Sequence, residues 1–331
     1  MVEPLVSVVI PTANRPQYLP RAVASALASM DSGDIEVIVV PNGPNESWKE
    51  SLKSYLKNPN VRIAPVRQAN ANIARNIGLS KARGDFVRFL DDDDYLFPEG
   101  ARNQYLQIIG SSFEVSSGKV LNLDISNKPL GLIPFPDTDD FVSACTYNGF
   151  SLPTSHVFKR CAIEKILWDP KTPRLQDHLW MIKLAEHREW RWLKCNDIVG
   201  VWFQHPNTRT SITRNCHENY QIIASHLFSL LNTLRINNRL SDERLQQIIK
   251  ALWHWIHTGF PMNPVYWHRV ATKVLKILPL SHPPIPFFQS IIGSFLGPLF
   301  LEWLILPKRI INHTIREAKQ RFYGIDYRRI I

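Results

Sequence analysis

Short apolar runs alternate with segments of helical spacing along the first part of the chain. The apolar runs predict strands at Leu5–Ile10, Ile35–Val40, Val61–Val66 and Asp85–Leu90. The segments between them predict helices at Pro20–Met30, Ser47–Lys57 and Ile73–Lys81. Because strands alternate with helices, we predict an α/β fold with a mostly parallel sheet and right-handed crossovers.

The pattern changes twice further along the chain. Residues 112–203 mix short strands with a helix that begins near Leu175, and the chain is mainly helical after about Asn215. We therefore expect an α/β domain over residues 1–215, made of two halves at 1–111 and 112–215. A helical extension is expected over residues 216–331.

An acidic run, Asp91–Asp94, directly follows the apolar end of the fourth predicted strand. Adjacent carboxylates repel one another, so we expect a cation to compensate them where the strand emerges. A solvated acidic turn is the plainer interpretation. The buried strand before the run and Pro98 after it, which suits a helix start, favour a site instead.

Polar segments follow the other predicted strands as well. Thr12–Arg15 comes after the first strand and Asn42 after the second. Since ligands of open α/β sheets collect at the carboxyl ends of the strands, these segments and the acidic run should share one crevice. The first strand is not followed by a GxGxxG motif, which argues against a dinucleotide-binding fold.

Charge and cysteine content narrow the class of protein. The 331 residues carry a formal net charge of +10, which indicates contact with phosphate ligands, a membrane surface or nucleic acid. The four cysteines are widely spaced and form no paired metal-ligand pattern. Reduced thiols and an N-terminus without a signal-peptide pattern lead us to expect a cytoplasmic protein.

Three segments together resemble glycosyltransferase family 2 in motif, order and spacing. They are Val6–Arg15 with Val-Ser-Val-Val-Ile-Pro-Thr-Ala-Asn-Arg, Ala74–Gly78 with Ala-Arg-Asn-Ile-Gly, and Phe89–Asp94 with Phe-Leu-Asp-Asp-Asp-Asp. The resemblance implies the GT-A fold and an inverting transferase. Such an enzyme moves sugar from a nucleoside-diphosphate sugar to a glycan or lipid-linked glycan acceptor, as in polysaccharide or lipopolysaccharide synthesis.

The resemblance also implies roles for the acidic run. Asp91 and Asp93 match the family's Asp-any-Asp pair, with Asp91 toward the ribose and Asp93 toward a divalent metal, Mn²⁺ or Mg²⁺. Asp92 is assigned to the donor site, and Asp94 either binds the metal through water or orients its neighbour. Carboxylate oxygens are suitable ligands for both metals, and a bound metal neutralises a diphosphate leaving group.

Further donor-binding residues are carried over by position. Arg75 corresponds to an arginine that faces the diphosphate, and the loop of Pro11, Thr12 and Arg15 corresponds to the base and ribose loop. Asn42 stands where the family commonly has an acidic pair that holds the nucleobase. An amide lacks the preference of a carboxylate for a ring imide N–H, so the usual uridine donor is in doubt.

Two residues outside this first third complete the expected site. Asp177, in Gln176-Asp177, matches the family's Glu-Asp motif and is the expected general base; a dipole at the helix N-terminus should favour its charged form. The alternative for Asp177 is a helix cap. His205, before Pro206, resembles a histidine that reaches the metal or diphosphate in many relatives and is an expected metal ligand; a purely structural histidine is the alternative. Arg209 and Arg214 follow in a loop that could close over the diphosphate.

The C-terminal part suggests a membrane contact. Residues 287–307 are strongly apolar, but Glu302, Pro298 and the pair Gly293 and Gly297 argue against an unbroken spanning helix. We expect residues 285–331, with their basic tail, to lie on the cytoplasmic face of the inner membrane. A buried hairpin of helices with a solvated tail is the alternative.

Other functions fit the sequence less well. A nucleotidyltransferase generally has a Gly-rich basic loop after its first strand, and Thr12–Arg15 is not one. A catalytically inactive binding or scaffold protein on a transferase fold stays open, because Asn42 and Gln176 depart from the family pattern. Nucleic-acid binding is not expected, because the basic residues form no aromatic-interleaved motif.

Overall fold

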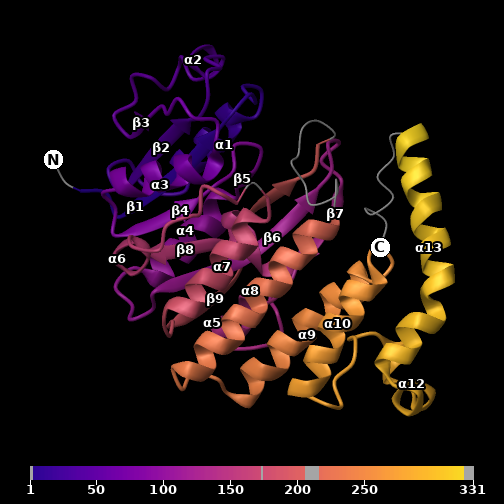
Figure 1. Ribbon diagram of the computed structural model, residues 1–331. Coiled ribbons are helices and arrows are strands. Elements are labelled where there is room, and N and C mark those ends of the chain that lie inside the picture. Colours follow the sequence, from indigo (N-terminus) through magenta and orange to yellow (C-terminus); the bar gives the residue numbers. More distant parts are fainter. Residues whose placement is uncertain (1–2, 173, 206–215, 324–331) are drawn as a thin grey trace. The chain divides into compact units, whose positions relative to one another are not determined.

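The computed structural model describes residues 3–172, 174–205 and 216–323, and the chain divides into two compact units, Met1–Ser211 and Ile212–Ile331 (Figure 1). The first unit is built on one mixed sheet of nine strands in the order β3-β2-β1-β4-β8-β6-β9-β5, with β7 paired to β6. The strands are β1 (Val6–Thr12), β2 (Ile35–Pro41), β3 (Val61–Ile63), β4 (Phe86–Phe89), β5 (Tyr95–Leu96), β6 (Val115–Leu123), β7 (Pro129–Ile133), β8 (His156–Lys159) and β9 (Trp192–Phe203).

Helices flank this sheet, as the alternating pattern predicts (Figure 1). They are α1 (Leu19–Leu27), α2 (Trp48–Ser51), α3 (Ala71–Lys81), α4 (Pro98–Ile108), α5 (Phe141–Ala144), α6 (Arg160–Ile163) and α7 (Gln176–His187), with 3₁₀ turns η1 (Asn148–Ser151) and η2 (Pro153–Ser155). The α/β prediction is confirmed.

Strand β1 lies at the centre of the parallel part of the sheet. It pairs in parallel with β2 along its whole length and with β4 only over Val6–Val9. Both β1 and β2 are buried at every position, which is typical of a sheet covered on both faces. The carboxyl ends of β1, β2 and β4 therefore meet at one edge, where the polar segments follow.

Two buried layers hold this part together. On one face, Val8 of β1 and Val37 of β2 belong to the same apolar cluster as Val23 of α1 and Tyr105 of α4. On the other, α3 approaches β1 so closely that a Cβ at Gly78 would lie 2.2 Å from a Val9 methyl group. Only glycine fits here, and the close approach brings Arg75, one turn earlier on α3, toward the end of β4.

Local boundaries differ from the predictions in four elements, β1, α2, β3 and α3. Strand β1 continues through Pro11 to Thr12, because β4 no longer pairs with it there and the missing proline N–H costs no ladder bond. The helix expected at Ser47–Lys57 is only α2, followed by turns, and β3 stops at Ile63. Helix α3 begins two residues before the expected start, since Asn70 caps it by accepting from Asn72 N and Ile73 N.

The second unit is helical, as expected after about Asn215. Its described helices are α8 (Cys216–Ile236), α9 (Asp242–Gly259), α10 (Pro264–Ile277), α11 (Pro286–Gln289), α12 (Ile291–Leu296) and α13 (Pro298–Tyr323). The apolar stretch 287–307 is interrupted at Ser290 and again at Gly297, whose φ is +77°. Among the described residues, no helix combines the length and apolar character needed to cross a membrane.

Candidate functional site

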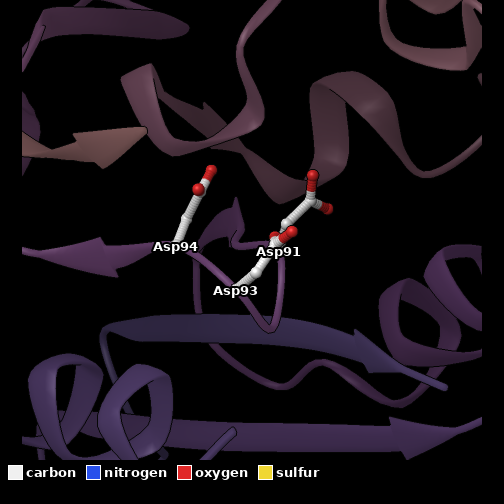
Figure 2. A group of neighbouring side chains, drawn as sticks. All are labelled: Asp91, Asp93 and Asp94. Carbon is white, nitrogen blue, oxygen red and sulfur yellow. The ribbon is translucent and has the colours of Figure 1, made fainter. Parts of the chain in front are cut away.

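The acidic run forms a tight turn at the end of β4. Asp94 N donates to Asp91 O at 3.1 Å, which turns the chain back toward β5. Figure 2 shows the side chains of Asp91, Asp93 and Asp94 rising from the same side of this turn. One carboxylate oxygen from each of the three lies within 4.8 Å of the others.

The loop after β1 meets the acidic run, as expected from the shared sheet edge. Thr12 Oγ1 donates to Asp92 Oδ2 at 2.6 Å, and Arg15 NH1 lies 3.0 Å from Asp92 Oδ1 and 2.6 Å from Asp93 Oδ2. Asn14 between them has a left-handed backbone with φ of 57°, a conformation that asparagine tolerates. One guanidinium is therefore shared by two adjacent carboxylates.

Asp92 is almost fully buried, and its charge is correspondingly costly. Burial raises the pKa of the Asp92 carboxyl to about 7; Arg15 opposes the shift, and the neighbouring Asp93 adds to it. Thr12 bonds to the charged form but does not outweigh the burial. Additional positive charge at this turn would favour the ionised form of Asp92.

Asp94 is an anchor of the turn. Its Oδ2 accepts from Thr154 Oγ1 at 3.1 Å, and its Oδ1 accepts from Phe203 N at 3.0 Å. On the other side of the run, Arg21 NH2 donates to the backbone O of Asp93 at 3.1 Å. Thr154 and Arg21 hold the acidic run in place, and neither residue was predicted from the sequence. The sequence feature that could have pointed to Arg21 is its position as a charged residue within the Ala-rich segment that forms α1.

His205 joins the acidic run from the end of β9. Its Nε2 lies 2.9 Å from Asp93 Oδ2, and its ring is 4.6 Å from that of Tyr18. The side chain is fully buried, and Nδ1 has no hydrogen-bond partner within the described part of the chain. Imidazole nitrogens and carboxylate oxygens are both metal ligands, so a buried imidazole beside an acidic cluster suits a bound metal ion.

Arg75 connects the acidic run to the start of α7. Its NH2 lies 2.8 Å from Asp91 Oδ1 and 3.4 Å from Asp177 Oδ1, and its NH1 donates to Gln176 Oε1 at 2.9 Å. Its guanidinium stands 4.5 Å from the centre of the Trp168 ring. Only 3% of Arg75 is exposed, so its charge is directed at protein partners.

Asp177 is the second residue of α7, and one third of its side chain is exposed. Burial of its surroundings raises the pKa of the Asp177 carboxyl to about 7, Arg75 opposes this, and Asp91 and Asp93 add to it. The helix dipole does not keep this pKa low, contrary to our expectation. Leu175, the N-cap residue of α7 two positions before Asp177, has a left-handed backbone with φ of 55°, a strained conformation of the kind found at functional sites.

A row of amides on α3 fixes the segment that leads to Asp177. Asn72 Nδ2 donates to Asp169 O at 2.6 Å and to Thr172 O at 3.0 Å. Asn76 exchanges two bonds of 2.9 Å with the backbone of Trp168. Helix α3 therefore holds Asp91 and Asp177 in a fixed relation through one set of side chains.

The remaining expected residues lie at the ends of β1 and β2. Pro11 is within β1, and Asn42 follows β2, where both its backbone N and its Nδ2 donate to Thr12 O at 2.9 Å. Asn42 thus fixes the loop after β1. Arg209 and Arg214 lie outside the described residues.

The donors at the acidic run suit a hard divalent cation. Asp91, Asp93 and Asp94 offer carboxylate oxygens, and His205 offers an imidazole nitrogen at Asp93. Arg15 and Arg75 each pair with two carboxylates, so four carboxylates share two guanidinium groups. Oxygen-rich sites with one imidazole are compatible with Mn²⁺ and Mg²⁺.

Comparison with known proteins identifies the domain that carries this site. Residues 7–126 match the family described as Glycosyl transferase family 2. The chain carries a glycosyltransferase family 2 domain. The matched residues include Arg15, Asn42, Arg75 and the whole acidic run.

Curated relatives are named as glycosyltransferases. An uncharacterised glycosyltransferase of Haemophilus influenzae is 27% identical over 46% of this chain and 61% of its own. A Campylobacter jejuni protein, GalNAc(5)-diNAcBac-PP-undecaprenol beta-1,3-glucosyltransferase, is 28% identical over 73% of this chain and 77% of its own. The chain therefore spans less than two thirds of the Haemophilus relative and more than two thirds of the Campylobacter one.

Solved glycosyltransferase structures share the fold of this chain. TarS 1-349 from S. aureus, in complex with UDP, has a TM-score of 0.56 at 18% identity, covering 97% of this chain and 92% of its own. The mannosyltransferase PcManGT from Pyrobaculum calidifontis, in complex with GDP-Man and Mn²⁺, has a TM-score of 0.51 at 15% identity, covering 96% and 87%. These likenesses support the GT-A fold expected from the sequence.

Proposed function

We propose that the chain is an inverting glycosyltransferase that moves a sugar from a nucleoside-diphosphate sugar to a glycan or lipid-linked glycan acceptor. The observation that carries the proposal is the placement of Asp91 and Asp177 on either side of Arg75. One carboxylate belongs to the acidic run and the other to the segment held by α3. A donor site and an acceptor base would be kept in register by this single buried guanidinium.

The acidic run is the proposed metal and diphosphate site. Asp93 and His205 would hold a Mn²⁺ or Mg²⁺ ion, with Asp91 and Asp94 as the neighbouring oxygen donors. The bound ion would supply Lewis-acid stabilisation of the diphosphate leaving group. Thr12, Arg15 and Asp92 would bind the donor beside it, and Pro11 and Asn42 would shape the loop that receives the base.

Asp177 is the proposed general base. Its exposed carboxylate oxygen can accept the proton of an acceptor hydroxyl while the new glycosidic bond forms on the opposite face of the sugar from the departing diphosphate. Since its pKa is raised to about 7, the carboxylate is a stronger base than an ordinary aspartate and is partly ionised at neutral pH. Arg75 stabilises the ionised form and fixes its position.

We further propose that the acceptor is linked to lipid and that residues 285–331 contact the cytoplasmic face of a membrane. The C. jejuni relative is named for an undecaprenol-linked acceptor, which supports this class of acceptor. The donor base is left open between uridine and guanosine. TarS was solved with UDP-GlcNAc and PcManGT with GDP-Man, and Asn42 replaces the acidic pair that would favour one of them.

The test is turnover of donors by the purified full-length chain. Release of nucleoside diphosphate from UDP- and GDP-sugars, with and without Mn²⁺ or Mg²⁺, should show metal-dependent turnover with one donor. An inactive scaffold on the same fold is the second candidate, supported by Gln176 and Asn42 in place of acids. Donor-dependent thermal stabilisation without turnover for any donor and acceptor would favour the scaffold and refute the transferase.

A further inference from the structure

Helix α13 presents an apolar face to solvent along several turns. Phe300, Leu304 and Ile311 are 55%, 57% and 59% exposed, and they recur at the spacing of one helix face. Trp303 and Ile315 lie beside them and are 43% and 49% exposed. Contiguous exposed apolar surface of this kind marks an interaction site in a folded protein.

The opposite face of α13 carries the charges. Glu302 is fully buried, with Oε1 2.6 Å from His257 Nδ1 of α9 and Oε2 2.8 Å from Arg309 NH1. Arg309 NH2 also donates to His257 O at 2.6 Å. The contacts with α9 fix the rotation of α13 about its axis, because turning the apolar face inward would separate both Glu302 and Arg309 from His257.

Basic residues accompany this apolar face. Lys308 is exposed on α13, and Arg269, Lys273 and Lys276 form an exposed stripe at intervals of four and three residues on α10. Helix α10 contacts α13 through His268, whose Nδ1 accepts from Trp303 Nε1 at 3.1 Å. Between residues 261 and 316, Glu302 is the one acid in the sequence, and it is buried and paired.

Net charge is also concentrated in this part of the chain. Residues 261–331 contain ten Lys or Arg and three Asp or Glu, against 39 and 29 in the whole sequence. Helix α12 adds two more apolar side chains one turn apart, Ile291 and Phe295, which are 91% and 89% exposed. Apolar side chains with flanking cations, and with the buried Glu302 as the single acid over residues 261–316, match the chemistry of an anionic lipid surface.

We infer that the exposed face of α13, together with Ile291 and Phe295 of α12 and the basic stripe of α10, binds the surface of an anionic lipid bilayer. The apolar side chains enter the headgroup region and the cations contact lipid phosphates, with α13 in the plane of the membrane. This inference rests on the membrane contact of the proposed function and assigns it to a defined face. The contacts of Glu302 and Arg309 with His257 of α9 orient that face outward.

The test is flotation of the full-length chain with vesicles. Wild type should float with vesicles containing phosphatidylglycerol and stay unbound with phosphatidylcholine alone. Serine at Phe300, Leu304 and Ile311 together should abolish flotation. The matched control is serine at Leu56, Leu106 and Ile125, which are 48%, 53% and 55% exposed in the first unit, and it should float like wild type.

Charge-reversal variants test the contribution of the basic residues to vesicle binding separately from that of the apolar side chains. Lys273→Glu with Lys276→Glu should weaken vesicle binding more than tenfold, since each cation near an anionic surface contributes about fivefold. Lys53→Glu with Lys128→Glu makes the same change in net charge at exposed positions of the first unit and should have little effect. If both double variants lost vesicle binding equally, the effect would be one of net charge alone, and the assignment of this face would be refuted.

Two further outcomes would overturn the inference. The first is failure of the wild-type chain to float with anionic vesicles. Concentration-dependent dimers that disappear in the α13 triple variant, without flotation of wild type, would assign the face to a second copy of the chain. Donor turnover is measured on the same proteins without vesicles, so that the proposed transferase activity and the proposed membrane binding are tested separately. Sugar transfer can fail while flotation succeeds, and flotation can fail while transfer succeeds.

Discussion

Within the described residues, acids, arginine and histidine meet in a largely buried cluster in each unit, and the two clusters differ in charge balance. In the second unit, Glu302 has one guanidinium, Arg309, and one imidazole. In the first unit, Arg15 and Arg75 each serve two carboxylates, and Asp94 lies beside them. A balanced cluster fixes the position of a helix, whereas an acid-rich one has capacity for a cationic ligand.

The largest expected effect comes from removing an acid of the first cluster. Asp177→Asn removes the proton acceptor and should reduce sugar transfer by about 10²–10⁴-fold, the usual contribution of a general base. Donor and metal binding should persist, because Asp91 and Asp93 remain. Transfer rates and donor-induced thermal shifts would check both. Asp139→Asn, at a side chain that is 99% exposed, is the control, and unimpaired transfer by Asp177→Asn would remove the base from the account.

The balanced cluster should respond in stability instead. Glu302→Leu leaves the partly buried guanidinium of Arg309 without its carboxylate and should destabilise the second unit by up to about 3 kcal/mol. Replacing both residues with leucine should restore most of this loss, because a buried pair is often exchangeable for apolar side chains. Hydrogen exchange of the α13 amides measures the effect without assuming two-state unfolding of the whole chain. Equal protection in wild type and the single variant would show that the pair does not hold the helix.

A second balanced acid, Glu36, offers a comparison within the first unit. Burial alone would raise the pKa of its carboxyl, but hydrogen bonds from Arg83, Ser7 and Arg62 outweigh burial and lower it. Because the folded pKa is depressed, Glu36 stabilises the protein above its unfolded pKa and loses this effect as pH falls through the folded value. Glu36→Gln should therefore cost about 2 kcal/mol at pH 7, with a smaller difference in melting temperature below about pH 4.

Replacing the Asp92 carboxylate with an amide should change the free energy of unfolding in the opposite direction. Its pKa is raised to about 7, so the stability it contributes is present below the unfolded pKa near 4 and is lost as pH rises through about 7. At pH 8 and without metal, Asp92→Asn should raise the unfolding free energy by about 1 kcal/mol. Melting curves in EDTA at pH 5 and pH 8 check this, and a lower melting temperature for the variant at pH 8 would contradict an acid excess.

Sequence patterns predicted most of the sheet edge that carries the site, because buried strands leave a strong apolar signal. Thr12, Arg15 and Asp92 were expected near one another and are in contact. Boundaries were harder, since the length of β1 depends on where β4 stops pairing with it. Helix α2 is short although its residues fit a longer helical pattern.

Contacts between distant segments were beyond the reach of sequence patterns. Arg75 and Gln176 are 101 residues apart, and Asp94 and Phe203 are 109 apart, so neither pair leaves a local signal. The raised pKa of Asp177 likewise depends on burial and, after it, on Asp91 and Asp93, which follow the end of β4. Residue type identified the candidates, and tertiary packing set their protonation and partners.

Direct measurement of metal binding tests the central claim that the acid-rich cluster holds a divalent cation. Mn²⁺ is titrated into the EDTA-treated full-length chain, and free Mn²⁺ is followed by electron paramagnetic resonance, with and without UDP or GDP. Wild type and Asp139→Asn should bind Mn²⁺, more tightly with one of the diphosphates, and Asp93→Asn should bind at least tenfold more weakly. Unchanged free Mn²⁺ with wild type, or equal binding by Asp93→Asn, would contradict the account.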